Sequence, residues 1–236
     1  MPRDQRSPCI APIGRPAACA LCDMRSVVCD DLTRLDLSRG AATVLFSRGA
    51  PILHADTPAD CAWIVKSGAV KATQSRGNGQ SGIIALMLPG DSFGLERNGR
   101  YLFGAVASRD ASICVVPRTK FQRALATLST RTDPAPLAAT HELIAAQDRL
   151  RLLARRSPQE RLARYLLWVD RKSPARADGR VDMPLDWCDV ADFLGIDLAT
   201  IRVALRTLRR VGMMTWDGGD RSVTLPDRRM LTEIAG

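Results

Sequence analysis

Short runs of apolar residues, interrupted by turn-forming residues, fill the chain from about residue 41 to residue 116. The runs are VLFSRGAPI, AWIVKSGAVKA, IIALMLPGDSFG and FGAVASRDASICVV. They are rich in the β-branched residues that strands favour. The glycines that punctuate them, at spacings suited to tight turns, are Gly49, Gly68, Gly77, Gly79, Gly90, Gly94, Gly99 and Gly104. The pattern predicts a small all-β barrel or jelly roll.

The hydrophobic period changes from about residue 137 onward. In LAATHELIAAQDRLRLLARR, leucines 143, 150 and 153 have the spacing of one face of a long helix. A long helix after a β-roll suits a dimer seam, and we place that seam at Leu143 and Leu150. Ser157 and Pro158 then have the order of an N-cap and a first helical residue, which predicts a second helix over PQERLARYLLWVDRK.

The C-terminal part of the chain has the pattern of a winged helix-turn-helix. We expect a strand in VDMPL, a helix in DWCDVADFLG, a turn at Gly195 and Ile196, and a second helix in DLATIRVALRTLRRVG. A hairpin in MMTWDGGDRSVTLP, turning at Gly218 and Gly219, completes it. The fold class is therefore α+β. The expected domains are a cysteine-containing tail (1–30), a β-roll sensor (31–133), a dimerisation helix (134–156) and the winged helix-turn-helix (157–236).

The second helix of this unit has a basic face. At about 100° per residue, one face collects the apolar residues Ile201, Ala204, Leu205 and Leu208. An adjacent face collects Arg202, Arg206 and Arg209, with Ala199 and Val203 beside them. Such a face fits the phosphates of DNA, although a solvated basic face on an ordinary helix gives the same pattern. The preceding helix, the glycine turn and the wing favour the DNA-binding interpretation.

Composition narrows the class of protein. The chain has 236 residues, 46% of them hydrophobic, and a formal net charge of +9, which suits a polyanionic partner. It contains neither a signal-peptide core nor an apolar run of about 20 residues, so we expect a cytoplasmic protein with no membrane partner. A jelly-roll enzyme would need clustered histidine ligands, but the two histidines, His54 and His141, are far apart. We therefore expect no enzyme.

Cysteine spacing points to a metal site. Cys19, Cys22 and Cys29 occur in CALCDMRSVVC, a spacing that lets three thiolates surround one iron–sulfur cluster, and Cys114 is the best candidate for a fourth ligand. A zinc site or a regulatory disulfide built from the same thiolates is the alternative. Cys9 lies in a proline-rich tail and is taken as spare, and Cys61, beside Ala62 and Trp63, is expected to be a small buried apolar residue.

The order of β-roll, long helix and winged helix-turn-helix, with the stretches WIVKSGAVKA, LPGDSFG and SPQERLARYLL, resembles the Crp/Fnr family of bacterial transcription regulators. The N-terminal cysteines resemble those of its fumarate and nitrate reductase regulator branch. That resemblance implies an oxygen-labile [4Fe–4S] cluster held by Cys19, Cys22, Cys29 and Cys114. This chain departs from the branch in having six residues between Cys22 and Cys29.

The resemblance also implies a mechanism. Cluster-bound protein would form a homodimer under low oxygen, bind a palindromic promoter site in double-stranded DNA, and act on RNA polymerase as an activator. Asp148, near the Leu143–Leu150 seam, matches a position where like charges across the dimer axis oppose association without the cluster; a solvated acid paired with Arg151 or Arg155 is the alternative. Sensing of nitric oxide, haem or thiol oxidation is the alternative for the signal. A cyclic-AMP pocket is not expected, because Phe103 and Gly104 occupy the place of the phosphate-binding Arg-Ser pair.

The recognition helix departs most from the family. Ala199 and Val203 replace a glutamate and an arginine that contact bases, and Arg202 replaces a serine. Apolar side chains can contact thymine methyl groups, and Arg202 can bind guanine through O6 and N7. We assign Arg206 and Arg209 to phosphates, and Trp187 and Thr200 match phosphate-contacting positions. Cys188, near a helix start, is a candidate oxidant sensor, with burial in the core as the alternative.

Overall fold

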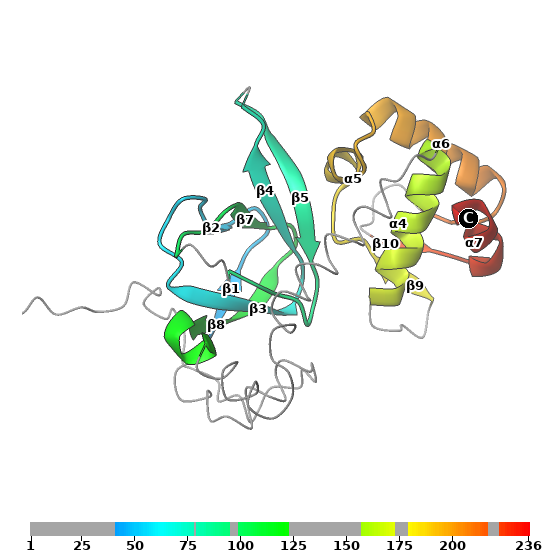
Figure 1. Cartoon of the computed structure of the whole chain (residues 1–236). Coiled ribbons are helices and arrows are strands. Elements are labelled where there is room, and N and C mark those ends of the chain that lie inside the picture. Colours follow the sequence, from blue (N-terminus) through cyan, green and yellow to red (C-terminus); the bar gives the residue numbers. More distant parts are fainter. Residues whose placement is uncertain (1–40, 78, 95–98, 123–156, 173–178, 217–221) are drawn as a thin grey trace, which may run out of the picture. The chain divides into compact units, whose positions relative to one another are not determined.

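The computed structural model describes residues 41–77, 79–94, 99–122, 157–172, 179–216 and 222–236 (Figure 1). The chain divides into two compact units. One contains the residues up to 74 and from 86 to 144, and the other contains 75–85 and the residues from 145 to the C-terminus. The expected cysteine tail (1–30) and dimerisation helix (134–156) lie outside the described residues.

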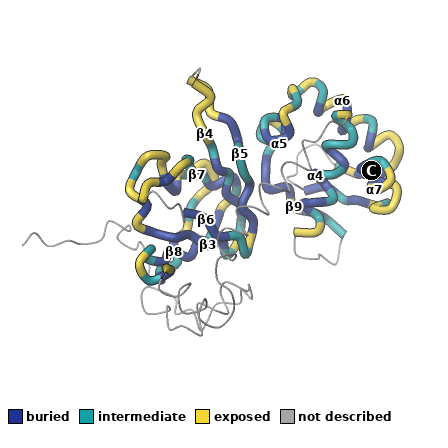
Figure 2. The backbone as a smooth tube through the Cα atoms, in the orientation of Figure 1, coloured by how far each residue is buried: buried dark blue, intermediate teal, exposed yellow. Residues whose placement is uncertain are grey.

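The N-terminal part is a roll of two four-stranded antiparallel sheets. One sheet has the strand order β1-β8-β3-β6 and the other has the order β2-β7-β4-β5. The strands are β1 (Ala42–Phe46), β2 (Pro51–Leu53), β3 (Cys61–Ser67), β4 (Val70–Ser75), β5 (Ser81–Met87), β6 (Ser92–Phe93), β7 (Gly104–Ala107) and β8 (Ala111–Pro117). The buried residues of these strands form the core of the roll, and Figure 2 colours them dark blue.

Trp63 is the centre of an aromatic cluster in that core. Its ring stacks on Phe93 at 6.3 Å between centroids and meets the edge of Phe46 at 6.4 Å. The indole Nε1 donates a hydrogen bond to the hydroxyl of Tyr101 at 3.0 Å, and that hydroxyl donates to the carbonyl of Cys61 at 2.9 Å. The polar atoms of the two large rings are therefore satisfied where they are buried.

Each predicted β run contains two strands divided by a turn. The turns between them fall at residues that the runs already contain: Gly49, Gly68, Gly90 and the Arg109–Asp110 pair. Gly68 shows why the second turn is tight: its φ is +80°, and a Cβ there would lie 2.1 Å from the carbonyl oxygen of Asp110. Only glycine permits this close approach of the β3–β4 turn to the β7–β8 turn.

The C-terminal part contains the expected helices. They are α4 (Pro158–Lys172), α5 (Trp187–Leu194), α6 (Leu198–Arg210) and α7 (Arg228–Ala235), with the short strands β9 (Arg180–Asp182) and β10 (Ser222–Thr224). The predicted cap of α4 is confirmed as a reciprocal capping box: Ser157 Oγ accepts from the backbone N–H of Glu160, and Glu160 Oε2 accepts from that of Ser157, both at 3.3 Å. None of the described helices is long and apolar enough to cross a membrane.

The described part of the wing agrees with the predicted hairpin. Thr215 and Thr224 pair antiparallel, and each backbone N–H donates to the other's carbonyl, at 2.9 and 3.1 Å. β10 also pairs antiparallel with β9, from Ser222 opposite Asp182 to Thr224 opposite Arg180, a pairing that was not predicted. The predicted turn at residues 218 and 219 lies outside the described residues. The strand predicted in VDMPL is shorter than expected, because it pairs only as far as Asp182.

Helix α7 was not predicted. Asp227 begins it, and its Oδ1 accepts a hydrogen bond from the backbone N–H of Met230 at 2.8 Å. Leu231 and Ala235 are buried in its contact with α4. Arg228 connects the two helices through a two-bonded ion pair with Asp170, at 2.7 Å from Nε and 2.9 Å from Nη2. The α+β fold class, with a β-roll and a helix-turn-helix, is confirmed.

Candidate functional site

Asp197 fixes the start of α6, the helix predicted to contact DNA. Its backbone is extended, and its carboxylate accepts hydrogen bonds from the backbone N–H of Thr200 at 2.8 Å and from the Thr200 hydroxyl at 2.5 Å. These bonds, first that from the Thr200 side chain, hold the pKa of Asp197 below its usual value. The cap is therefore a carboxylate at neutral pH, matched to the positive end of the helix dipole.

Gly195 makes the turn between α5 and α6. Its φ of 63° places it in the left-handed region, and its N–H donates to the carbonyl of Asp192 at 3.2 Å. The N–H of Ile196 donates to the carbonyl of Ala191 at 2.9 Å, which completes the end of α5. The predicted glycine turn is thus confirmed, and it sets the direction in which α6 begins.

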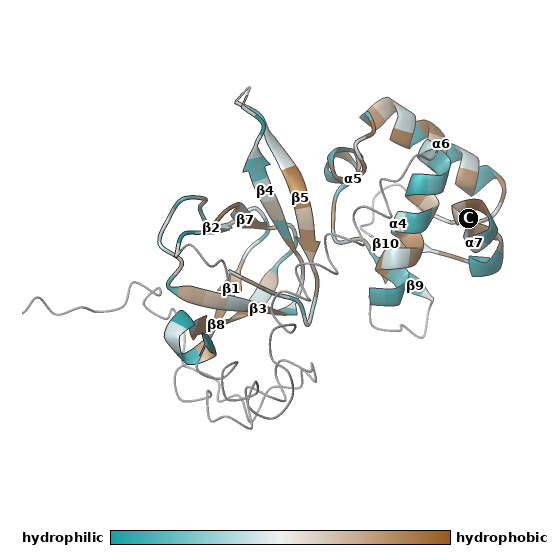
Figure 3. Ribbon diagram, viewed as in Figure 1, coloured by the Kyte–Doolittle hydropathy of each residue, from teal (hydrophilic) through white to brown (hydrophobic). Residues whose placement is uncertain are grey.

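The buried face of α6 is the predicted one. Its side chains, at most 4% exposed, are Ile201, Ala204, Leu205 and Leu208. They pack against α4 and α5. Hydrophobic and hydrophilic residues alternate along the helix in Figure 3 because only this side contributes to the core.

The outer face of α6 is exposed and basic. A narrow arc of about 60° holds Ala199, Val203, Arg206 and Arg210 at the centre of this face, by the helical angle of about 100° per residue. Arg202 and Arg209 lie to one side of that arc, and all six residues are exposed. α6 contains no acidic residue. The sequence interpretation missed Arg210, although the same angle calculation places it near Ala199.

Two side chains on this helix are anchored to its own backbone. Arg206 Nε donates to the carbonyl of Arg202 at 3.2 Å, and the Thr207 hydroxyl donates to the carbonyl of Val203 at 3.1 Å. Both bonds run back by four residues, so each side chain leans toward the N-terminal end of the helix. The Arg206 guanidinium therefore lies over the preceding turn.

Trp187 connects the start of α5 to the wing. Its ring meets that of Trp216 edge to face, with centroids 5.7 Å apart and planes at 74°. Both rings are only partly buried. Cys188, the next residue, is exposed, so the core alternative for this cysteine is wrong.

Cys114 lies on β8 in the β-roll. It is opposite Thr43 of β1 and Ile64 of β3, and it is 7% exposed. Its neighbour Val115 is opposite Trp63, on the aromatic side of the sheet. Because neighbouring residues in a strand face opposite ways, the Cys114 side chain lies on the other face of the sheet. Its sulfur is a thiol and takes no part in a disulfide.

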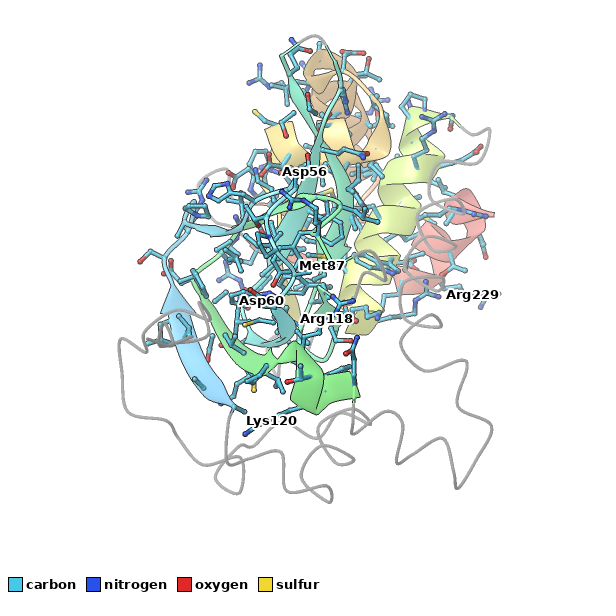
Figure 4. All side chains as sticks on the ribbon, turned by 60° about the vertical axis from the view of Figure 1, so that its left-hand side comes forward. Asp56, Asp60, Met87, Arg118, Lys120 and Arg229 are labelled. Carbon is cyan, nitrogen blue, oxygen red and sulfur yellow. The ribbon has the colours of Figure 1, made fainter. Side chains whose placement is uncertain are left out.

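Cys61 is on β3, three positions from Ile64, and therefore on the aromatic face. It is buried, as predicted, with 2% exposure. Its sulfur is disulfide-bonded, however, so it is not the simple apolar thiol that the sequence suggested. The pairing of β3 with β8 extends one residue beyond Cys61. There the backbone N–H of Arg118 donates to the carbonyl of Asp60 at 2.8 Å, and Figure 4 labels both residues.

Several predicted site residues lie outside the described part of the chain. They are Cys19, Cys22, Cys29, Leu143, Asp148 and Leu150. Among the described residues, no group of three or more histidine, cysteine or acidic side chains could hold a metal ion. Of the four predicted cluster ligands, the structure therefore describes Cys114 alone.

Comparison with known proteins defines the class. Residues 43–127 match the cyclic nucleotide-binding domain, and residues 160–234 match the Crp-like helix-turn-helix domain. The FixK2 structure from Bradyrhizobium japonicum superposes with a TM-score of 0.74 at 31% identity, covering 83% of this chain and 98% of that one. The molecule is thus a DNA-binding regulator with a cyclic-nucleotide-binding type of β-roll.

Curated relatives specify the family. The nitrogen fixation regulation protein FixK of Azorhizobium caulinodans is 33% identical over 198 residues, which is 80% of this chain and 77% of the relative. The transcriptional activator protein FnrL of Cereibacter sphaeroides is 26% identical over 231 residues, which is 95% of this chain and 90% of the relative. The chain belongs to the Crp/Fnr family of transcription regulators. Members bind DNA and act as dimers, and the family is not enzymatic, as the sequence predicted.

Proposed function

We propose that this chain is an oxygen-responsive transcription activator whose [4Fe–4S] cluster promotes dimerisation and promoter binding under low oxygen. The proposed ligands are Cys19, Cys22, Cys29 and Cys114. The names of the relatives support the physiological setting: nitrogen fixation regulation for FixK, and anaerobic regulatory protein for a relative from Pasteurella multocida that is 23% identical over 197 residues. In this proposal the protein acts in the cytoplasm and activates transcription through contact with RNA polymerase.

The position of Cys114 is the observation that supports the cluster-binding part of this proposal. Iron–sulfur clusters are held by cysteine thiolates, and Cys114 is a thiol in a strand rather than in a loose loop. Its neighbours on the same face, Ile64 and Val116, are at most 1% exposed. Such apolar surroundings keep water from a sulfur ligand and tune the group it binds.

The chemistry of the donor set fits the cluster. A bound cluster would supply a group that oxygen degrades. The chain would supply four soft sulfur ligands and, in the segment predicted as the dimerisation helix, Asp148, whose charge would repel its counterpart across the dimer axis. Cluster binding would then shift the balance between monomer and dimer by an amount comparable to a coupling energy of about 1–3 kcal/mol.

The direct test is chemical analysis of full-length protein purified without oxygen. We expect a brown protein with about four iron and four sulfide per chain, which binds a palindromic duplex and loses both colour and binding in air. A colourless protein that contains zinc and binds DNA equally in air would contradict the proposal.

The disulfide at Cys61 favours a second candidate, in which thiol oxidation is the signal. In that case iron-free protein would change its DNA affinity when a dithiol reductant is added, and Cys61→Ala protein would not. In the cluster mechanism, the same reductant leaves iron-free protein unable to bind.

A further inference from the structure

The centre of the exposed face of α6 is occupied by Arg206 rather than by Arg202. Arg206 lies within about 20° of Ala199 around the helix axis, whereas Arg202 lies about 60° to one side. A recognition helix lies in the major groove and contacts base edges mainly from its N-terminal half. Around the helix, a residue at the centre of the exposed face is directed into the groove, and a residue at the edge of that face is directed toward the backbone phosphates. The positions alone therefore exchange the roles that we predicted from the sequence, guanine contact for Arg202 and phosphate contact for Arg206.

The hydrogen bond from Arg206 Nε to the carbonyl of Arg202 moves the guanidinium to the level of the base-contacting positions. Arg206 itself is two turns beyond Ala199, too far along the helix for a short side chain to contact the same bases. Its anchored side chain leans back by one turn, to the level of Arg202 and Val203. The Arg206 guanidinium thus lies at the level of Val203, the position at which the family resemblance implies an arginine.

The same bond decides which edge of the guanidinium is presented. Nε is engaged with the helix, so the remaining donors are on Nη1 and Nη2. A planar fork of two such donors matches O6 and N7 of guanine, the commonest specific contact between protein and DNA. Anchoring also lowers the entropy lost when the long side chain is ordered on a base.

Val203 provides an apolar contact beside this fork. It is 49% exposed although its side chain is fully apolar, and it lies three residues before Arg206, within side-chain reach on the helix surface. Its methyl groups fit the 5-methyl group of thymine, the apolar mark in the major groove. Successive bases in a strand are about 3.4 Å apart, so two neighbouring side chains can contact two adjacent bases.

We infer that Arg206 and Val203 together determine specificity for a guanine next to a thymine, and that Arg202 contacts phosphate. This inference rests on the DNA-binding function of α6, and it gives that function a sequence preference. The pair forms on one helix of one chain, so each half-site of a dimer would contain the same two-base step.

The test begins with selection of binding sites from random duplexes by full-length protein purified without oxygen. In the selected site, 7-deazaguanine removes the N7 acceptor at one position, and uracil removes the 5-methyl group of thymine at the next. We expect each replacement to weaken DNA binding by the parent about tenfold. Arg206→Ala should become indifferent to deazaguanine, and Val203→Ala should become indifferent to uracil.

Arg209→Ala is the matched control, because Arg209 is exposed on the same helix but lies at the edge of the face. It should weaken all sequences alike and keep both preferences. If Arg206→Ala keeps the parent's preference for guanine while Arg202→Ala loses it, the inference is overturned and DNA binding by α6 stands. If the parent enriches no sequence at all, the proposed function itself fails.

Discussion

Asp197 contributes to the stability of α6 through a charge, so its effect depends on pH. Hydrogen bonds from Thr200 keep its pKa below the usual value. A lowered pKa in the folded state means that the stabilisation is present above the pKa of the unfolded state, about 3.9, and is lost as the pH falls through the lower folded value. The start of the recognition helix should therefore weaken only in acid.

We predict that Asp197→Ala lowers the midpoint of thermal unfolding at pH 7 and that the difference from the parent shrinks near pH 3. Circular dichroism at both pH values measures it. Asp197→Asn is the control, because asparagine also caps helices but does not titrate. If the Ala variant and the parent differ equally at both pH values, the charge of Asp197 is not the source of the stabilisation.

Cys114 should be indispensable for the cluster. We predict that Cys114→Ser protein, purified without oxygen, loses at least half of its iron and its visible absorbance, because one of four thiolates is removed. Cys188→Ser and Cys61→Ser are the controls, and they should keep their iron. Full iron content in the Cys114 variant would assign the fourth ligand to another residue.

At the scale of the element, helix α7 is attached to α4 by the Arg228–Asp170 pair. The hydrogen bond to Asp170 raises the pKa of the Arg228 guanidinium, and the Asp170 side chain is only 17% exposed. We predict that Arg228→Ala lowers the free energy of unfolding by about 1 kcal/mol, a modest amount because the arginine side chain is 48% exposed and the pair is screened.

Arg229 is the matched control for this change. Figure 4 labels it on α7, where its side chain is 92% exposed and 3.6 Å from Glu233. Removing such an exposed pair should change the free energy of unfolding by a few tenths of a kcal/mol at most. Equal losses in the two variants, measured by urea unfolding, would mean that the bond to Asp170 adds nothing.

The basic face of α6 should make DNA affinity strongly dependent on salt. Each phosphate neutralised contributes about −0.9 to the slope of log K against log salt concentration. We predict that Arg209→Ala makes the slope shallower by about 1.8 per dimer, since one contact is lost in each subunit. Binding isotherms at several salt concentrations measure this slope, and an unchanged slope would place Arg209 away from the phosphates.

The elements that the sequence predicted well have local signals. α4 and α6 begin at caps, Ser157 and Asp197, and α5 ends at a glycine that must adopt a positive φ. α7 was missed although Met230, Leu231, Ile234 and Ala235 have the spacing of one helix face, because its eight residues make only about two turns. In the β runs the glycines marked the turns: Gly49, Gly68 and Gly90 each separate two strands.

Other features depend on tertiary contacts that no local pattern contains. The disulfide state of Cys61 depends on which sulfur comes near it in the fold, and its sequence neighbours indicate only burial. The orientation of Arg206 depends on a rotamer that bonds to the carbonyl four residues earlier. Charge patterning located the basic face correctly but could not rank the arginines within it.

At the scale of the whole molecule, the proposed regulation depends on dimerisation. Asp148 lies outside the described residues, and its role as a dimer switch stays a prediction. We predict that Asp148→Ala protein dimerises and binds DNA in air without a cluster, because a like-charge repulsion of about 1–3 kcal/mol is removed. Analytical ultracentrifugation in air checks this, and an aerobic monomer like the parent would reduce Asp148 to ordinary surface charge.

The pairing of β9 with β10 has a consequence for folding kinetics. These strands flank α5 and α6 in the sequence, so their ladder closes a loop that contains both helices. The ladder limits how far either helix can move, and it forms only after a distant chain closure, which is slow compared with helix formation. In native-state hydrogen exchange, the buried amides of α5, α6 and the two strands should therefore exchange together, as one cooperative opening.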